Sequence, residues 1–172
     1  MSCVSRLRKI FSRRKNKVTF FGPTKKVLLV GDAGSGKTAF LHKHSYKDSN
    51  LYTSGPTLWI EVSPIDWKGE NGPLRFNVWD CAGEEKFKGL EDGYFVEADA
   101  AIIFQKKEDS IGARRYADIF IKQFGEDFPI VLVTGKCDSD SFSTTDGSLC
   151  ISSITGRNFN IPFEALYEYF SA

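Results

Sequence analysis

The segment Gly31-Asp-Ala-Gly-Ser-Gly-Lys-Thr38 constrains the fold of this chain more than any other feature. It has the pattern G-x-x-x-x-G-K-[S/T], and it follows an apolar run, 27–30, typical of a strand buried on both faces. Residues 37–45 after it have the pattern of a helix. Glycines at such a turn allow positive φ and let backbone N–H groups face an anion, which the helix dipole also favours. The segment therefore predicts a phosphate-binding loop, with a glycine-rich turn carrying an exposed lysine as the alternative.

Lys37 and Thr38 carry the chemistry expected of such a loop. The Lys37 ammonium is expected between the β- and γ-phosphates, and the Thr38 hydroxyl is expected on Mg²⁺. Mg²⁺ prefers phosphate oxygens and water and takes few protein ligands, so an acid is expected nearby. Asp80 ends a predicted strand and can hold a Mg²⁺-bound water, while the backbone N–H of Gly83 can reach a γ-phosphate. The alternative for Asp80 is a residue that merely initiates a turn.

Short apolar runs alternate with helical patterns along the chain. The runs cover 27–30, 58–62, 74–80, 100–104, 130–134 and 149–151. Helical patterns cover 37–45, 110–124 and 163–170. This alternation predicts an α/β domain with a mainly parallel sheet and helices on both faces. The turn sequence Gly-Glu-Asn-Gly-Pro at 69–73 adds an antiparallel pair of edge strands, so we expect a mixed sheet.

Composition excludes several classes of protein. At 41% hydrophobic and 26% charged residues, the 172-residue chain is neither disordered nor collagenous, and its length suits one domain. No apolar run approaches the roughly 20 residues of a membrane-spanning helix. Cys3, Cys81, Cys137 and Cys150 form no CxxC pair, so we expect free thiols in a reducing compartment. The two histidines are expected to be surface polar residues.

Positive charge is concentrated at the N-terminus. Residues 1–26 hold nine basic and no acidic side chains, whereas the rest of the chain holds 14 basic and 22 acidic ones. We therefore expect residues 1–24 to form a flexible basic arm and residues 25–172 to form the folded domain.

The arm has the pattern of a helix at a membrane surface, because apolar and basic residues alternate over 1–11. Ser2 excludes N-myristoylation, but Cys3 is a candidate for lipidation beside the basic run. An import-like basic cluster, weak RNA affinity and a solvated tail are the alternatives.

Together with the loop at 31–38, three further stretches resemble the Ras superfamily of small GTPases, most closely its Ran branch. They are Thr57 in Gly-Pro-Thr-Leu, the segment FNVWDCAGEEKFKGLEDGY at 76–94, and Gly135-Lys-Cys-Asp138. Segment 76–94 is the specific part of the resemblance, which covers residues 25 to 170. The resemblance implies a P-loop NTPase fold with a six-stranded sheet and five helices. It also implies GTP and GDP as ligands, Mg²⁺ as cofactor, GTP hydrolysis, and two switch segments ordered by the γ-phosphate.

Residue by residue, the resemblance implies a guanine nucleotide site. Thr57 corresponds to the switch threonine that binds Mg²⁺ and the γ-phosphate. The Lys136 stem covers the purine, and Asp138 selects guanine by accepting from its ring N–H and amino group, a donor pair that adenine lacks. Ser152 and Ser153 lie in the loop whose backbone contacts the guanine carbonyl oxygen. The residues expected at GTP are Asp32, Ala33, Gly34, Ser35, Gly36, Lys37, Thr38, Thr57, Gly83, Lys136, Asp138, Ser152 and Ser153.

Four departures from the family pattern bear on mechanism. Glu84 replaces the glutamine that orients the attacking water, and a carboxylate cannot donate to the transition-state oxygens. Ala33 replaces a glycine near the γ-phosphate, where its methyl crowds an incoming arginine. Gly135 replaces the asparagine of N-K-x-D, which weakens nucleotide binding by about 1–3 kcal/mol. Ile154 replaces the lysine of I-S-A-K.

The sequence thus predicts a monomeric Ran-like GTPase switch with slow hydrolysis, in which Lys37 and Glu84 are the catalytic candidates. Effectors, exchange factors and GTPase-activating proteins are the expected partners, through the switch segments, and no specific nucleic acid is expected. The expected location is the cytoplasm or nucleus, with nucleocytoplasmic transport as one role and peripheral membrane attachment through the arm as another. A non-hydrolysing decoy, suggested by Ala33, Glu84 and Gly135, and a membrane-anchored Rab-like trafficking GTPase, suggested by Cys3, are the alternatives.

Overall fold

The computed structural model describes residues 20, 22–45, 60–81, 91–107, 110–139 and 146–172. Its strands are β1 (Thr24–Gly31), β2 (Glu61–Gly69), β3 (Gly72–Asp80), β4 (Ala100–Gln105), β5 (Ile130–Thr134) and β6 (Leu149–Cys150). Its helices are α2 (Lys37–Ser45), α3 (Glu91–Phe95), α4 (Ile111–Phe124) and α5 (Ile161–Ser171). The described residues thus contain four helices, where the resemblance implies five. In this part of the chain, no helix is both long and apolar enough to span a membrane.

The six strands form one sheet in the order β2-β3-β1-β4-β5-β6. β1 pairs in parallel with β3 and β4, and β4, β5 and β6 continue the parallel arrangement. β2 runs antiparallel to β3. The predicted mixed, six-stranded α/β sheet is therefore confirmed. β1 occupies a central position because its residues 27–30 are buried and apolar on both faces.

The edge strand lies later in the chain than the sequence indicates. The apolar run 58–62 predicts a strand there, but β2 begins at Glu61. Along β2, Ser63 and Ile65 are buried, while Pro64 between them is exposed. This alternation is typical of a strand with one face on the core, and proline is tolerated at a sheet edge because its missing N–H then removes no ladder bond.

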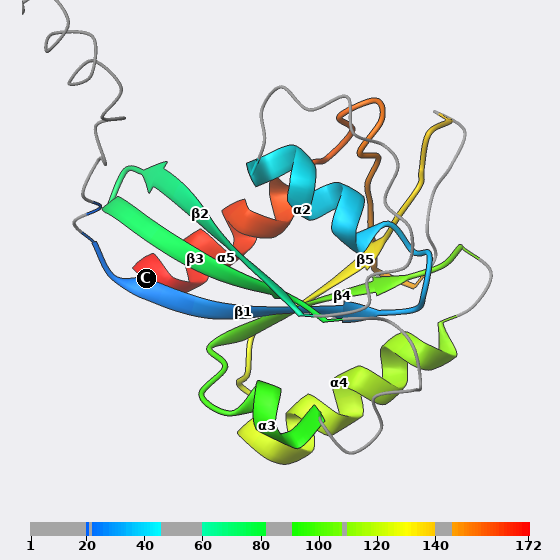
Figure 1. Cartoon of the computed structure of the whole chain (residues 1–172), viewed down its shortest axis with the longest axis horizontal. Coiled ribbons are helices and arrows are strands. Elements are labelled where there is room, and N and C mark those ends of the chain that lie inside the picture. The colour runs from blue at the N-terminus through cyan, green and yellow to red at the C-terminus, as the bar shows by residue number, and fades with distance from the viewer. Residues whose placement is uncertain (1–19, 21, 46–59, 82–90, 108–109, 140–145) are drawn as a thin grey trace, which may run out of the picture.

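Helices cover both faces of the sheet, as Figure 1 shows: α2 and α5 lie on one side and α3 and α4 on the other. Phe40 of α2 stacks on Phe163 of α5 with ring centroids 5.5 Å apart, in the core of the first face. Phe95 of α3 meets Phe120 of α4 edge to face at 5.1 Å in the core of the second. Helix α5 begins at Ile161, two residues before the predicted position, with Pro162 in its first turn.

The cysteines differ from the expectation of free thiols. Cys137, which follows β5, forms a disulfide with Cys150 at the end of β6. The pair can form because β5 and β6 are neighbours, with Thr134 opposite Cys150 in the parallel register. The prediction of free thiols is therefore wrong for these two residues.

Candidate functional site

The phosphate loop joins the end of β1 to the start of α2. Gly34 and Gly36 have φ values of 73° and 105°, a left-handed conformation that disfavours residues with a β-carbon. Lys37 is the first residue of α2. The first N–H groups of a helix have no acceptor within the helix and carry its positive dipole end. The predicted strand-loop-helix arrangement for binding an anion is thus present.

Lys37 reaches back across this loop. Its Nζ donates to the carbonyl oxygens of Gly31, at 2.9 Å, and Asp32, at 2.8 Å. Lys37 is buried, and desolvation lowers its pKa, an effect that the nearby carboxylates of Asp80 and Asp32 oppose. A polyphosphate would give this ammonium charged acceptors in place of two neutral carbonyls.

Thr38 and Asp80 form the second part of the site. The Thr38 hydroxyl donates to Asp80 Oδ2 at 2.6 Å, which joins the first turn of α2 to the last residue of β3. Asp80 is completely buried, and its Oδ1 has no hydrogen-bond partner among the described residues. Burial raises the pKa of Asp80, whereas the Thr38 hydrogen bond and the charge of Lys37 lower it.

The Thr38 hydroxyl and the Asp80 carboxylate suit Mg²⁺ as ligands. A hydroxyl and a carboxylate with one unpartnered buried oxygen suit an ion that keeps most of its ligands as phosphate oxygens and water. In the described part of the chain, no three His, Cys, Asp or Glu side chains gather closely enough to hold a metal ion by themselves. Thr38 and Asp80 are the described residues that would hold Mg²⁺.

The residues predicted to recognise the base lie at the same end of the parallel strands. Lys136 follows β5 with a φ of 60°, a strained conformation that folded proteins keep mostly at functional sites. A β-carbon placed on Gly36 would lie 3.9 Å from Lys136 Cγ, so the lysine stem extends along the phosphate loop. Ser152 is fully buried, and its hydroxyl donates to Asp138 Oδ1 at 2.5 Å. The structure thus brings Lys136, Asp138 and Ser152 together beside the loop.

Ser153 contacts helix α2 through its backbone carbonyl. Its carbonyl oxygen accepts a hydrogen bond from the Nζ of Lys43 on α2. The preceding Ser152 hydroxyl accepts from the backbone N–H groups of Ile154 and Thr155 at 3.2 and 2.9 Å. The loop after β6 is therefore a hydrogen-bonded turn that α2 holds in place, and the replacement of lysine by Ile154 leaves these contacts intact.

Two loop residues are placed in ways that the motif does not reveal. The Asp32 carboxylate lies against α4, where a β-carbon on Gly112 would overlap its Oδ1. Asp32 therefore faces the loop through its backbone carbonyl, which also accepts from the N–H of Ser35 at 3.2 Å. Ala33 is exposed.

The predicted site residues Thr57, Gly83 and Glu84, and the candidate lipidation residue Cys3, lie outside the described residues.

A polar cluster at the ends of β4 and β5, in which all members but the exposed Asp146 are buried, was missed by the sequence analysis. Gln105 Nε2 donates to Thr134 Oγ1 at 2.9 Å and to Asp146 Oδ2, and the Ser148 hydroxyl donates to Asp146 Oδ1 at 2.7 Å. The hydrogen bonds from Gln105 and then Ser148 lower the pKa of Asp146 to about 2. No motif signals this cluster, because its members come from three separate segments. It fixes the strand ends from which the base-recognition loops leave.

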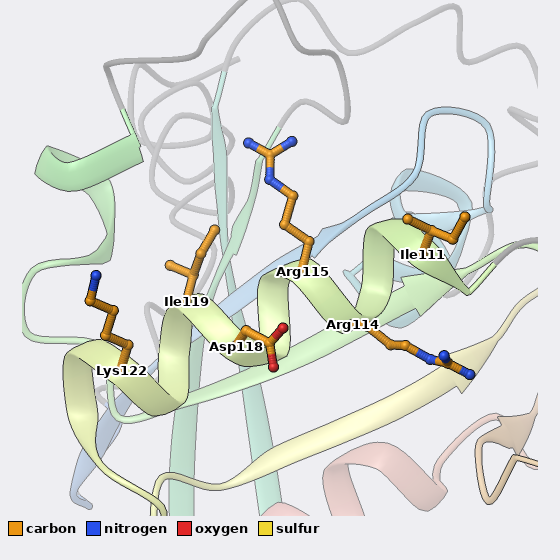
Figure 2. Close-up of a pocket in the computed structure, with 6 residues that line it drawn as sticks. All are labelled: Ile111, Arg114, Arg115, Asp118, Ile119 and Lys122. Atoms are coloured by element: carbon orange, nitrogen blue, oxygen red, sulfur yellow. The ribbon is translucent and has the colours of Figure 1, made fainter.

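A further hollow, of about 510 Å³, lies along the outer side of α4. Figure 2 shows the side chains that line it, all from this helix: Ile111, Arg114, Arg115, Asp118, Ile119 and Lys122. None of the predicted nucleotide residues lines it. The candidate site therefore remains the phosphate loop and the two base-recognition loops.

Comparison with known families agrees with this geometry. Residues 26–138, about two thirds of the chain, match the family described as Roc, Ras of Complex, domain of DAPkinase. The chain belongs to the Roc family. Roc is a GTPase domain of the Ras superfamily, so the match confirms the predicted superfamily and the P-loop α/β fold. The matched residues of this Roc domain include the phosphate loop, Asp80, Lys136 and Asp138.

Proposed function

We propose that this Roc domain binds GTP and GDP with Mg²⁺ and acts as a switch whose state is read by protein partners. The observation that supports this most directly is the convergence of three groups at one edge of the sheet. They are the Lys37 ammonium, the Thr38–Asp80 pair and the Asp138–Ser152 pair. Ligands of open α/β sheets bind at the carboxyl ends of the strands, where these groups lie.

The phosphate part of the site works through charge. The helix start and the glycine loop present N–H groups to phosphate oxygens, and Lys37 adds a mobile ammonium. Thr38 and Asp80 would hold Mg²⁺, which would supply positive charge against the phosphates. Asp80 has a buried oxygen that no described residue contacts and that could orient a ligand of the metal, and Thr38 already contacts that carboxylate.

The base part of the site selects guanine through Asp138. Its carboxylate accepts two hydrogen bonds from the guanine ring N–H and amino group, whereas adenine presents no such pair. Ser152 donates to Oδ1 of this carboxylate and thereby fixes its orientation before a nucleotide arrives. The Lys136 stem, which lies beside Gly36, covers one purine face.

Hydrolysis is slow in this proposal. Glu84 accepts a hydrogen bond from water but cannot donate one to the transition-state oxygens, and its charge repels the phosphates. Ala33 adds a methyl group on the exposed side of the loop, where an arginine from a GTPase-activating protein would approach.

Single-turnover hydrolysis of radiolabelled GTP tests the enzymatic part. The proposal expects slow release of phosphate by the wild-type domain and none by Lys37→Ala, with Lys122→Ala on the outer side of α4 as a matched control that keeps wild-type turnover. Phosphate release that is equal in the wild type and Lys37→Ala would contradict the enzymatic part.

A second candidate function is a non-hydrolysing, partner-binding decoy. Gly135 favours it, because the family's asparagine is absent from the base-recognition loop. Nucleotide binding without phosphate release, even with a GTPase-activating protein, would support the decoy over the enzyme.

Two biological roles rest on the sequence alone. The Ran-like segment 76–94 supports a role in nucleocytoplasmic transport, and the basic arm with Cys3 supports trafficking at a membrane surface. Flotation with anionic liposomes separates them. If deleting residues 1–17 leaves flotation unchanged, the membrane role is wrong.

A further inference from the structure

The disulfide lies between the two base-recognition loops. Cys137 directly precedes Asp138, and Cys150 comes two residues before Ser152. Hydrogen bonds between the same segments surround it: the Cys137 N–H donates to the carbonyl of Ile151 at 2.9 Å. Both cysteines are buried, at 3% and 8% exposure. The covalent bond therefore ties the loop that carries Asp138 to the strand that leads to Ser152.

Gly135 stands where the family pattern N-K-x-D has asparagine. A β-carbon on Gly135 would overlap the backbone carbonyl oxygen of Ser35, so the two loops pack backbone against backbone. The asparagine that the family carries at this position does not fit this arrangement. Asp138 is instead tied to the segment after β6, through the Ser152 hydroxyl and through its neighbour Cys137, which is bonded to Cys150.

The strand that carries the partner cysteine is short. β6 has two residues, and its parallel ladder with β5 consists of the pairs Val133↔Leu149 and Thr134↔Cys150. Two ladder pairs are well below the length of an ordinary strand. A crosslink over 13 positions restricts the conformations of such a loop substantially.

We propose that the Cys137–Cys150 disulfide positions Asp138 and Ser152 for guanine, and that its reduction weakens guanine nucleotide binding by about ten-fold or more. Cys137 and Cys150 are positioning residues, because they act through the carboxylate and the loop that contact the base. The inference rests on the proposed function. It adds that the affinity of the domain for GTP depends on thiol oxidation.

The chemical step is thiol–disulfide exchange with a dithiol reductant. One thiolate of the dithiol attacks a cysteine sulfur, the protein S–S bond breaks, and a mixed disulfide forms. The second thiolate then displaces the protein cysteine. The dithiol is oxidised to a cyclic disulfide, and Cys137 and Cys150 gain two electrons and two protons to become thiols. Both cysteines are buried, so the reductant reaches them when the two loops open locally.

The test titrates the full chain with GTP, ATP and inorganic tripolyphosphate, each with Mg²⁺, before and after treatment with dithiothreitol. Thiol counting on the unfolded protein establishes the state, and reduction should release two thiols. We expect GTP affinity to fall at least ten-fold on reduction, with tripolyphosphate affinity unchanged, since the hydrogen bonds of Lys37 and Thr38 involve no residue between the two cysteines. Reoxidation should restore GTP binding.

Variants separate positioning from general destabilisation. The double variant Cys137→Ser/Cys150→Ser should bind GTP as weakly as the reduced wild type and should not respond to dithiothreitol. Cys3→Ser, in the basic arm, should respond as the wild type does. If reduction weakens tripolyphosphate and GTP binding alike, the disulfide has a general structural role and the proposal is wrong.

The remaining outcomes separate this inference from the proposed function. Equal GTP affinity in the oxidised and reduced states, or a protein that releases no thiols on reduction, overturns the inference alone. A domain that binds tripolyphosphate but does not prefer GTP over ATP in either state contradicts the proposed function, and the inference fails with it.

Discussion

The Thr38 hydroxyl lies 2.6 Å from Asp80 Oδ2, although the two residues are 42 positions apart in the sequence. The bond joins the start of the helix after the phosphate loop to the end of β3. Since Asp80 is fully buried and desolvation raises its pKa, the folded state holds its negative charge at the expense of stability. A buried carboxylate kept under these conditions is typical of a functional site.

Asp80→Asn should therefore separate function from stability. The amide is isosteric and can still accept from Thr38, but it removes the buried charge, so we expect the nucleotide-free domain to melt at a higher temperature. Mg²⁺ should strengthen GTP binding by the wild type. In the variant this gain in affinity should be at least ten-fold smaller, which corresponds to about 1.4 kcal/mol. Thermal melts and GTP titrations with and without Mg²⁺ check both effects. An unchanged Mg²⁺ effect would show that Asp80 does not serve the metal.

Gly135→Ala should destabilise the domain by about 1–3 kcal/mol, because the new methyl group overlaps the carbonyl of Ser35. Gly93 on α3 offers a matched control, since a β-carbon there meets no atom within 4 Å. Gly93→Ala should be neutral or stabilising by about 0.5 kcal/mol. Urea unfolding measures both changes. If Gly135→Asn instead restored tight GTP binding without loss of stability, the close packing of the two loops would be refuted.

His44 should make the stability of the domain depend on pH. Its ring stacks on Phe159 with centroids 3.9 Å apart, and burial lowers its pKa from 6.5 to about 4. Below pH 6.5 the unfolded chain binds a proton that the folded domain does not. Stability should therefore fall between pH 6.5 and 4, by at most about 3 kcal/mol.

His44→Phe keeps an aromatic ring at this position and removes the titrating group, so it should flatten the pH dependence of unfolding over this range. His42→Gln, two positions earlier on the same helix, should leave the dependence as it is in the wild type. Equal slopes for the wild type and His44→Phe would mean that His44 is not the group responsible.

Glu84→Gln should speed GTP hydrolysis at least ten-fold, because the amide both orients the attacking water and donates to the transition state. GTP affinity should change little. Single-turnover rates measure the effect, and Glu85→Gln at the next position is the control. No increase over the wild type would place the cause of slow turnover elsewhere.

The sequence predicted the parallel part of the sheet well because each central strand is a continuous apolar run. Residues 27–30 and 100–104 are buried on both faces, so hydrophobicity alone marks them. β2 was misplaced because it alternates between buried Ser63 and Ile65 and exposed Pro64, which gives no apolar run.

Residues of the candidate site could be predicted where they lie within one sequence motif. Contacts between distant segments were missed. Lys37 and Thr38 follow from a local pattern, whereas the Cys137–Cys150 bond needs β5 and β6 to be neighbours. His44 was expected as a surface polar residue, and the structure places it half-buried against Phe159. Its partner Phe159 is 115 positions away, and no periodicity within α2 reveals such a contact.

Recognition of guanine by Asp138 is the central claim of the proposed function. Equilibrium titration of the oxidised wild-type domain with GTP, GDP, ATP and XTP, with Mg²⁺ present, tests it directly, beside the variant Asp138→Asn. We expect GTP and GDP to bind the wild type at least a hundred-fold more tightly than ATP. The amide of the variant would offer a donor to the second carbonyl of xanthine, so the variant should lose GTP and gain XTP. Equal affinity of the wild type for GTP and ATP, or no change in preference in the variant, would contradict the central claim.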